Sequence, residues 1–413
     1  MNERTARHEA DILIVGAGCA GTSLAHHLRR LGYGGTVTLL DERTSWAREQ
    51  RWCCWQIPDS LEHLVARSWA QWQVRDAERV ARQSGASLGY HQISAPAFYD
   101  YFHRQWRQSD QIQLRGGARV LALEENADGV VARTSRGGFR ARLAFDARHA
   151  GSPALEQLNA RGHLHLRQSF VGWIIETARP TFEAQTATLM DFRLNADKTS
   201  GVSFAYVLPD SPTRALVEST HFGARELAPA AHERALREYL DAFVLNGASY
   251  QIRAREAGAL PMASAPLRSR LGARVWAIGV AGGAARPSSG YAFGRIQKQT
   301  AQLAQSIVDG TVLQDQSDAG AASKYAVLDE IFLDVMARDA ALAERCFVEM
   351  FARVPPAALV RFLSEESSPG DDARLIAALP KRAFLEASLR RASAHRQARR
   401  YRQVAPAREW AGA

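Results

Sequence analysis

A glutamate in the middle of the chain has the residue type and surroundings for proton transfer. Glu218 belongs to the segment ALVESTHF at 215–222, whose alternating pattern predicts a strand that places Glu218 on the same face as Leu216. A carboxyl group among apolar side chains is poorly solvated, which favours its protonated form near neutral pH and suits it to act as a general acid. The alternatives are a solvent-facing glutamate or an ion pair with Arg214 or Arg225.

Three other titratable residues in this part of the chain are each given an expected role. Asp191, in the segment MDFR, is a second candidate catalytic carboxylate, although Arg193 could simply be its salt-bridge partner. His221 falls on the opposite face of the predicted strand from Glu218 and is expected to be structural. Glu256 is a candidate for orienting a pocket, and its role is left open.

The cysteines and histidines do not form a metal-binding pattern. The four cysteines match neither a disulfide framework nor a Cys-x-x-Cys site, so they are expected to be reduced and packed among other side chains. They are Cys19, Cys53, Cys54 and Cys346. The 12 histidines include no H-E-x-x-H motif. The sequence therefore predicts no metal site.

The clearest cofactor motif lies near the beginning of the chain. An apolar run at 12–15 predicts a buried strand, which leads into G-x-G-x-x-G and a helical pattern at 22–31. The three glycines are Gly16, Gly18 and Gly21. They permit a tight turn, close approach of the backbone to a pyrophosphate, and close packing of helix on strand. A second strand at 37–40 ends at Asp41, where a carboxylate can bind a ribose hydroxyl. This order predicts a dinucleotide-binding unit.

Two later segments are expected to return to this unit. A strand ending in Phe145 delivers Asp146, and a strand at 275–279 opens into a glycine-rich turn before a helix at 291–308. Such a late return is typical of two-domain FAD enzymes. The glycine-rich turn can lie against a flavin, and the helix N-terminus favours its anionic reduced form. The candidate cofactor-binding residues in these segments are Asp146, Gly279, Gly282, Gly283, Pro287 and Gly290.

The remaining patterns predict further helices and a second sheet. Helices are expected at 61–82 and 97–107, followed by an antiparallel meander between 112 and 145. A helix at 230–243 is expected to cover the second, mostly antiparallel sheet. The strands expected in that sheet lie at 170–175, 187–192, 202–208 and 215–222.

Together these elements predict an α/β fold with α+β insertions, namely a two-domain FAD-binding Rossmann-type flavoprotein. It would have an antiparallel substrate-domain sheet and a helical C-terminal region. The predicted boundaries are 1–169 and 263–310 for the FAD-binding domain, 170–262 for the substrate domain, and 311–413 for the helical region with its basic tail. A chain of 413 residues, 46% of them hydrophobic, is sufficient for two or three packed domains.

The formal net charge of +9 is densest near the C-terminus. The arginines concerned are Arg390, Arg391, Arg396, Arg399, Arg400 and Arg402. They could form a solvated helix face, or they could attract anionic lipid headgroups. No nucleic-acid-binding motif accompanies them, so no nucleic-acid partner is expected. No apolar stretch reaches the roughly 18 to 20 residues that span a bilayer, and no signal peptide is visible. The protein is therefore expected to be soluble or peripheral.

Several motifs spread along the chain are shared with one family. They are RWCCW at 51–55, MDFR at 190–193, FAYVLP at 204–209, ESTH at 218–221, EAGALPM at 256–262, GVAGG at 279–283, RPSSGYAF at 286–293 and RIQ at 295–297. In these motifs the chain resembles the bacterial flavin-dependent lycopene cyclases of carotenoid biosynthesis, and the likeness extends from Asp11 to about Arg391. Val280 and Ala281 stand where many FAD enzymes have an aspartate that binds the ribityl chain.

The resemblance implies a β-cyclase that converts the linear ends of lycopene into β-ionone rings, giving γ-carotene and then β-carotene. The reaction would be an acid-initiated carbocation cyclisation without net redox change, with Glu218 as the acid and Asp191 as a second site. The implied cofactor is reduced FAD, with NADPH or NADH as the reductant. The implied partners are lycopene and related linear carotenoids, and a cytoplasmic protein would meet them at the surface of the cytoplasmic membrane.

Two other functions stay open at this point. An NAD(P)H-dependent flavin monooxygenase, or a prenyl or carotenoid reductase, would carry the same dinucleotide motifs and would consume reductant one for one with product. A non-catalytic carotenoid-binding flavoprotein would bind the ligand and form no product.

Overall fold

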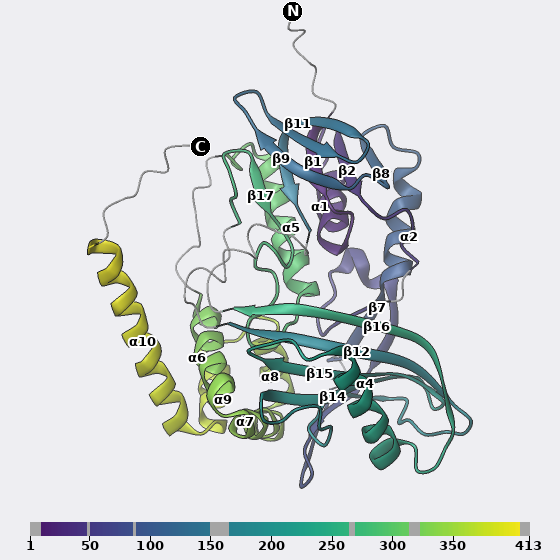
Figure 1. Cartoon of the computed structure of the whole chain (residues 1–413), viewed down its shortest axis with the longest axis vertical. Helices are drawn as coiled ribbons and strands as arrows, with labels where there is room; N and C mark the ends of the chain where they lie inside the picture. The colour runs from purple at the N-terminus through teal and green to yellow at the C-terminus, as the bar shows by residue number, and fades with distance from the viewer. Residues whose placement is uncertain are drawn as a thin grey trace, which may run out of the picture.

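A computed structural model describes residues 10–47, 50–85, 88–148, 165–263, 269–313 and 323–404, with the backbone alone described for 397–404. Two large β-sheets lie one above the other, and helices cover their faces (Figure 1). A third, small sheet lies beside them, with its strands in the order β3 (Arg51–Cys54), β7 (Tyr90–Ser94) and β4 (Val65–Trp69). The expected α/β flavoprotein fold, with a second sheet and a helical C-terminal region, is confirmed.

The first sheet has seven strands and is built around the apolar run near the beginning of the chain. Its order is β8 (Ile112–Gly116), β2 (Val37–Asp41), β1 (Ala10–Val15), β11 (Gly137–Asp146), β10 (Val130–Thr134) and β9 (Val120–Glu125), with β17 (Val275–Ala277) beside the end of β11. β9, β10 and β11 form the expected antiparallel meander. The strand at 112, expected in that meander, is instead β8 and pairs parallel with β2. The buried parallel strands are almost continuously apolar, because both faces of the sheet are covered.

Three helices pack on this sheet and form one apolar core with it. They are α1 (Cys19–Arg30), α2 (Ala95–Trp106) and α5 (Phe293–Val308). Leu24 and Leu28 of α1 and Ile296 and Ala304 of α5 belong to this core. Because α5 packs along α1, the late return segment lies against the first helix of the chain (Figure 1).

The second sheet also has seven strands. Its order is β16 (Tyr250–Ala263), β12 (His165–Thr177), β15 (Arg214–Gly223), β14 (Gly201–Ser211), β13 (Thr186–Asp191), β5 (Gln71–Arg75) and β6 (Val80–Ser84). Neighbouring strands are antiparallel except β13 and β5, which are parallel. The expected, mostly antiparallel sheet is therefore confirmed, with three strands added, namely β16 and, from before residue 170, β5 and β6.

The helix expected at 61–82 is wrong. This segment forms a 3₁₀ helix, η1 (Asp59–Leu64), followed by β4, β5 and most of β6. Two tryptophans, Trp69 and Trp72, are fully buried in these strands, and β6 alternates exposed and buried residues. The turn after Arg75 is fixed by Asp76, whose carboxylate accepts the Arg79 backbone N–H at 2.7 Å. Strand packing therefore outweighed a helix-like spacing of apolar residues.

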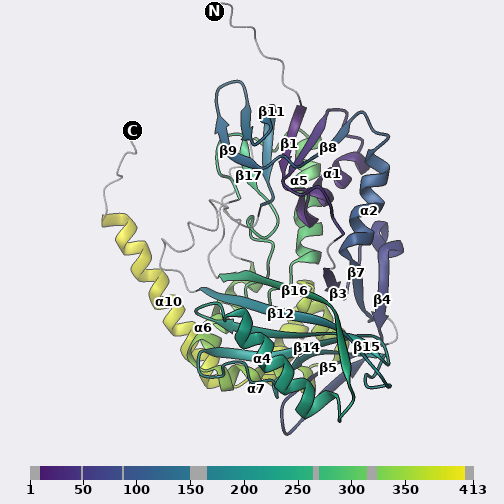
Figure 2. The same ribbon diagram turned by 45° about the vertical axis from the view of Figure 1, so that its right-hand side comes forward.

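Helices cover both faces of the second sheet. On one face α4 (Pro229–Tyr239) and a π-helical turn, η2 (Leu240–Val244), pack on alternate residues such as Trp173 and Val217. On the other face Leu216 and Phe222 share a core with the C-terminal helices. These helices are α6 (Lys324–Arg338), α7 (Ala340–Arg353), α8 (Pro356–Leu363) and α9 (Pro369–Ala378). The last helix, α10 (Lys381–Val404), runs along the outside of this bundle, as both ribbon views show (Figures 1 and 2). Within the described ranges, we find no helix with the length and apolar composition of a membrane span.

Candidate active site

The glycine-rich turn after β1 has the geometry expected of a dinucleotide cradle. Gly16 has φ +97°, and its N–H donates to the Leu40 carbonyl at 2.7 Å. A Cβ on Gly21 would lie 2.0 Å from the Gly16 carbonyl oxygen, so α1 packs on the turn at a distance that only glycine permits. Gly18 lies at the start of α1 with its Cβ position almost open, since the nearest atom is Arg43 Nη2 at 3.8 Å. The backbone at this turn is therefore accessible to a phosphate group.

Asp41 lies at the end of β2, beside this turn. Its Oδ2 accepts the Ala17 backbone N–H at 2.7 Å, and the guanidinium of Arg43 pairs with the same carboxylate at 2.7 Å. Burial alone would raise the pKa of Asp41, but the hydrogen bonds and charge of Arg43 lower it below its usual value. The carboxylate therefore stays ionised, in the position expected for binding a ribose hydroxyl.

The return segment reaches the same turn from the other side. Gly279 has φ +68°, and a Cβ there would lie 2.6 Å from Ala20 Cβ in the first turn of α1. Gln299 of α5 fixes the segment, because it accepts the Gly279 N–H and donates to the Gly282 carbonyl, both at 2.7 Å. Asp146 is fully buried and pairs with Arg148 at 2.7 Å. The Asp146 carbonyl accepts the Ile278 N–H, which joins the two returning segments.

The remaining predicted cofactor residues, Gly283, Pro287 and Gly290, connect the first sheet with the second. Gly283 and Gly290 both have positive φ, and a Cβ on Gly290 would lie 1.8 Å from Oε1 of Gln168 on β12. Pro287, three residues earlier, is half-buried. The predicted cofactor residues of the two returning segments thus meet the glycine turn at one end and the second sheet at the other.

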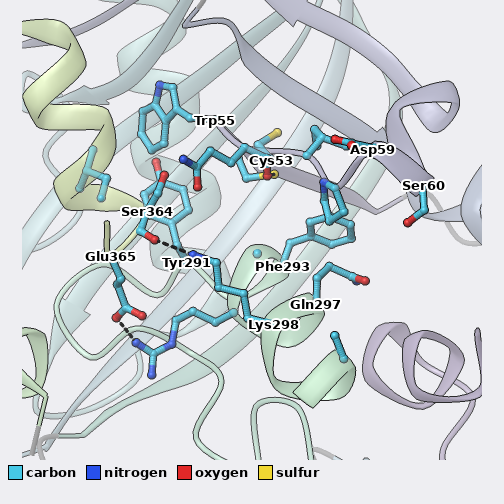
Figure 3. Close-up of a pocket in the computed structure, with 18 of the residues that line it drawn as sticks. Cys53, Trp55, Asp59, Ser60, Tyr291, Phe293, Gln297, Lys298, Ser364 and Glu365 are labelled. Atoms are coloured by element: carbon cyan, nitrogen blue, oxygen red, sulfur yellow. Dashed lines mark hydrogen bonds and ion pairs between the residues drawn. The ribbon is translucent and has the colours of Figure 1, made fainter. Parts of the chain in front are cut away.

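A cavity of 440 Å³ adjoins the return segment. Its lining comes from β3 and the residues after it, from the beginning of α5, and from the end of α8 (Figure 3). Trp55, Tyr291 and Phe293 supply aromatic surface. On one side Lys298 donates to the Ser364 carbonyl at 3.0 Å and Arg295 pairs with Glu365, which ties α5 to α8.

Glu218 lies on β15, outside the lining of this cavity. Its side chain is 9% exposed, and Oε1 accepts a hydrogen bond from Thr220 Oγ1 at 2.6 Å. Burial, and then the negative charge of Glu256, raise the pKa of Glu218 to about 8, although the Thr220 hydrogen bond opposes the shift. Cys53 and Tyr291, which line the cavity, lie within electrostatic reach of this carboxyl. The structure therefore places a carboxyl group with a raised pKa within electrostatic reach of two residues that line the cavity.

Three tyrosines that the sequence did not single out complete this region. The Tyr90 hydroxyl lies 2.9 Å from the Tyr206 hydroxyl and donates to that of Tyr291 at 3.2 Å. The Trp55 ring packs on Tyr90 and Tyr291, with centroids 4.6 and 5.6 Å apart. Tyr206 lies directly opposite Glu218 on the neighbouring strand. That pairing was the available sequence signal, since a hairpin through 202–222 brings the two residues together.

Asp191 lies on the other side of the second sheet. Its carboxylate pairs with Arg193 at 2.6 Å and accepts the hydroxyl of Tyr239, the last residue of α4, at 2.8 Å. His221 is also on this face, fully buried, with Nδ1 2.8 Å from Ser203 Oγ. The alternation predicted for 215–222 is thus confirmed, and the structure does not bring Asp191 together with Glu218.

The fold defines a class. The described chain superposes on flavoproteins of solved structure that share only 14% of their residues with it, which identifies the fold alone. One is a geranylgeranyl bacteriochlorophyll reductase-like protein from Thermoplasma acidophilum, with a TM-score of 0.59 over 91% of this chain and 98% of that one. Another is a p-nitrophenol 4-monooxygenase from Pseudomonas putida, with a TM-score of 0.57 over 93% and 98%. A halogenase solved in complex with FAD has a TM-score of 0.56 over 97% and 93%.

Within this class the sequence identifies a family. The profile of the lycopene cyclase protein family matches residues 11–389, so the chain belongs to that family. A lycopene beta-cyclase from Paracoccus sp. is 27% identical over 397 residues, which cover 90% of this chain and 94% of the relative. A lycopene beta-cyclase from Pantoea ananas is 27% identical over 221 residues, 51% of this chain and 52% of the relative.

Proposed function

We propose that this protein is a lycopene β-cyclase, which converts the linear ends of lycopene into β-ionone rings through γ-carotene to β-carotene. The observation that carries the proposal is the Glu218 carboxyl, which is buried, has its pKa raised to about 8, and lies within electrostatic reach of Cys53 and Tyr291 in the cavity wall. Family membership supplies the substrate class. The reaction is an isomerisation, so no atom other than a proton is added or removed.

The chain's own residues can perform the acid step. Glu218 donates its proton to the terminal double bond of the end group, the resulting cation closes the ring, and loss of a ring proton leaves the new double bond. Trp55 and Tyr291 line the cavity and Tyr206 lies opposite Glu218, and aromatic faces stabilise a neighbouring cation. Their packing also excludes water, which would otherwise trap the cation as an alcohol.

The cofactor in this proposal is FAD. Gly16, Gly18 and Asp41 fit its pyrophosphate and ribose, because the turn is open at Gly18 and the carboxylate is ionised. The segment from Gly279 to Gly290 is assigned to the flavin in this proposal, because it runs from the glycine turn to the second sheet, where its positive-φ glycines pack closely on Ala20 and Gln168. When bound in its reduced form, FAD would supply a negative charge near the cationic centre without net oxidation, and NADPH or NADH would be its reductant.

Asp191 is assigned a structural role in this proposal. It is 1% exposed, paired with Arg193 and hydrogen-bonded to Tyr239, and it faces α4 rather than the cavity. Its carboxylate holds β13 against the helix that covers the sheet.

The proposal includes a peripheral position on the cytoplasmic membrane, where a linear carotenoid is dissolved. Leu385 and Leu389 of α10 are 63% and 59% exposed, and the side chain of Arg382 on the same helix is almost fully exposed. Arg390 and Arg391, part of the basic tail, pair instead with Asp334 and Glu330 of α6. The exposed leucines and the exposed basic residues of α10 are therefore the surface that would meet lipid. The side chains of Arg399, Arg400 and Arg402 lie outside the described residues.

The test is an anaerobic assay with lycopene in anionic liposomes, comparing oxidised with prereduced FAD and counting NAD(P)H against product. We expect a product isomeric with lycopene, formed only with reduced FAD and without stoichiometric loss of reductant. Glu218→Gln should lower the rate by about 10²- to 10⁴-fold, as loss of a general acid does. Glu226→Gln, the same change at an exposed glutamate paired with Arg167, is the matched control.

The two other functions give different results in this assay. A monooxygenase or a prenyl or carotenoid reductase would change the product mass by oxygen or hydrogen, with matching loss of reductant. A carotenoid-binding flavoprotein would bind lycopene without product, and Glu218→Gln would change nothing. Either result would overturn the cyclase proposal.

A further inference from the structure

A second cavity, of 410 Å³, lies within the C-terminal helical bundle. Its walls are mainly apolar side chains from α6, α7, α9 and α10. These side chains include Phe332, Met350, Leu375 and Phe384. Protein interiors are close-packed, with few voids larger than a water molecule. An apolar space of this size therefore indicates room for a ligand.

The second cavity adjoins the first one. Arg286 and Leu363 line both of them. Arg286 is fixed, because its guanidinium pairs with Asp329 at 3.2 Å and donates to the carbonyls of Phe362 and Leu363 at 3.0 and 3.2 Å. Leu363 is half-buried and supplies apolar surface at the junction.

The same cavity also reaches the surface. Ile376 of α9 and Leu385 of α10 line it, and they are 53% and 63% exposed. Apolar side chains that are both exposed and part of a cavity wall mark an entrance for an apolar molecule. The second cavity therefore extends from the outer side of α9 and α10 to Arg286 and Leu363, the residues that it shares with the first cavity.

We propose that this second cavity binds the part of the linear carotenoid that is not being cyclised, and that Ile376 and Leu385 form its entrance. The inference rests on the proposed function, because it takes the substrate from it. The first cavity surrounds one end group, whereas the remaining polyene is a long hydrocarbon that needs its own apolar surface. Burial of that hydrocarbon away from water stabilises the complex.

The proposal is tested with two variants of α10 and one matched control. Ser388→Trp places a large side chain into the cavity, since Ser388 is part of its wall. Leu385→Glu puts a charge at the entrance on an exposed position, so it leaves the core intact. Leu121→Glu makes the same change at a leucine of β9 that is 65% exposed and outside the lining of this cavity.

Two readouts are measured on the full-length, FAD-loaded protein. The first is fluorescence of parinaric acid, a linear polyene fatty acid that becomes fluorescent in an apolar site, and its displacement by lycopene. The second is the KM for lycopene and for a shortened analogue that has one end group and no long tail. We expect Ser388→Trp and Leu385→Glu to weaken probe binding at least tenfold and to raise the KM for lycopene, with the KM for the short analogue unchanged. Leu121→Glu should behave like the parent protein.

The outcomes separate this inference from the proposed function. Normal probe binding and an unchanged KM for lycopene in both cavity variants would overturn the inference even if cyclisation is confirmed. Probe displacement by phospholipid but not by lycopene would overturn it in favour of a lipid-chain site. Probe binding that lycopene displaces, in a protein that forms no ring, would support the cavity and reject the cyclase. If Ser388→Trp does not fold, the comparison of Leu385→Glu with Leu121→Glu decides.

Discussion

Glu218 and Glu256 lie in one row of the second sheet, on either side of Gly172. Gly172 of β12 pairs with Glu218 of β15 on one side and with Glu256 of β16 on the other. A Cβ on Gly172 would lie 3.0 Å from the Glu256 Cγ and 3.0 Å from Leu216 Cδ1. The absence of a side chain on Gly172 therefore leaves a space between the two carboxyl groups. Across this space the charge of Glu256 raises the pKa of Glu218. Two carboxylates in one apolar region are costly to ionise together, so one of them keeps its proton.

Glu256→Gln should move the alkaline limb of the pH–rate profile to lower pH. The acid form of Glu218 is the active one, so activity falls as pH rises through its pKa, which is about 8. Removing the charge of Glu256 lowers that pKa, and Arg51 and Cys53, which also face this region, are unchanged. The measurement is the turnover rate between pH 6 and 9.5. An alkaline limb at the parental position would show that Glu256 does not set the acidity, and Glu176→Gln on β12 is the surface control.

Gly172→Ala should affect both stability and pH dependence. The added methyl group requires Glu256 or Leu216 to move by a few tenths of an ångström, because both atoms would be at 3.0 Å. Overpacking of this kind costs about 1 to 3 kcal/mol of unfolding free energy. The alkaline limb should also shift, since Glu256 is displaced. Urea unfolding and the pH profile of the folded protein check the two effects separately. A stable variant with parental pH dependence would contradict the spacer role.

The pH dependence of stability should report the protonation of Glu218. Its pKa is raised from 4.5 to about 8 in the folded protein, so between these values the native state binds more protons than the unfolded state. This contribution is present in full below pH 4.5 and is lost as pH rises through 8, at up to about 1.4 kcal/mol per pH unit. Glu218→Gln should flatten the decline. Chemical unfolding of both proteins at pH 5, 7 and 9 measures it, and parallel curves would contradict the assignment.

Asp191→Asn should lower stability and leave the chemistry of the folded protein intact. The substitution removes the charge that pairs with Arg193, whose side chain is only 16% exposed. Breaking a buried pair from one side costs about 3 kcal/mol. The check is thermal unfolding together with the turnover rate per folded molecule. A folded variant whose turnover rate falls by about two orders of magnitude, the effect of losing a general acid or base, would restore Asp191 as a catalytic residue.

The elements nearest to chemical motifs were predictable from the sequence. The first strand, its glycines, Asp41 and the face of Glu218 follow from local periodicity and spacing, and the structure reproduces them. The segment at 61–82 was mispredicted because its apolar spacing suits a helix until Trp69 and Trp72 are placed in sheets. The pairing of Tyr206 with Glu218 follows from the hairpin of β14 and β15. Gly172 and Glu256 join this row only through the register of β12 and β16, which no local pattern contains.

The inclusion of β5 and β6 in the second sheet affects how the chain can assemble. β5 pairs parallel with β13, so Gln71 can pair with Thr186 only after much of the first sheet has been synthesised. Pairings of such separation form slowly. During synthesis the β5–β6 hairpin leaves the ribosome before any other strand of its sheet exists, with an unpaired edge exposed. The segment that contains β5 and β6 therefore links the first sheet to the second. A fragment beginning at β12 would lack the last two strands of its own sheet.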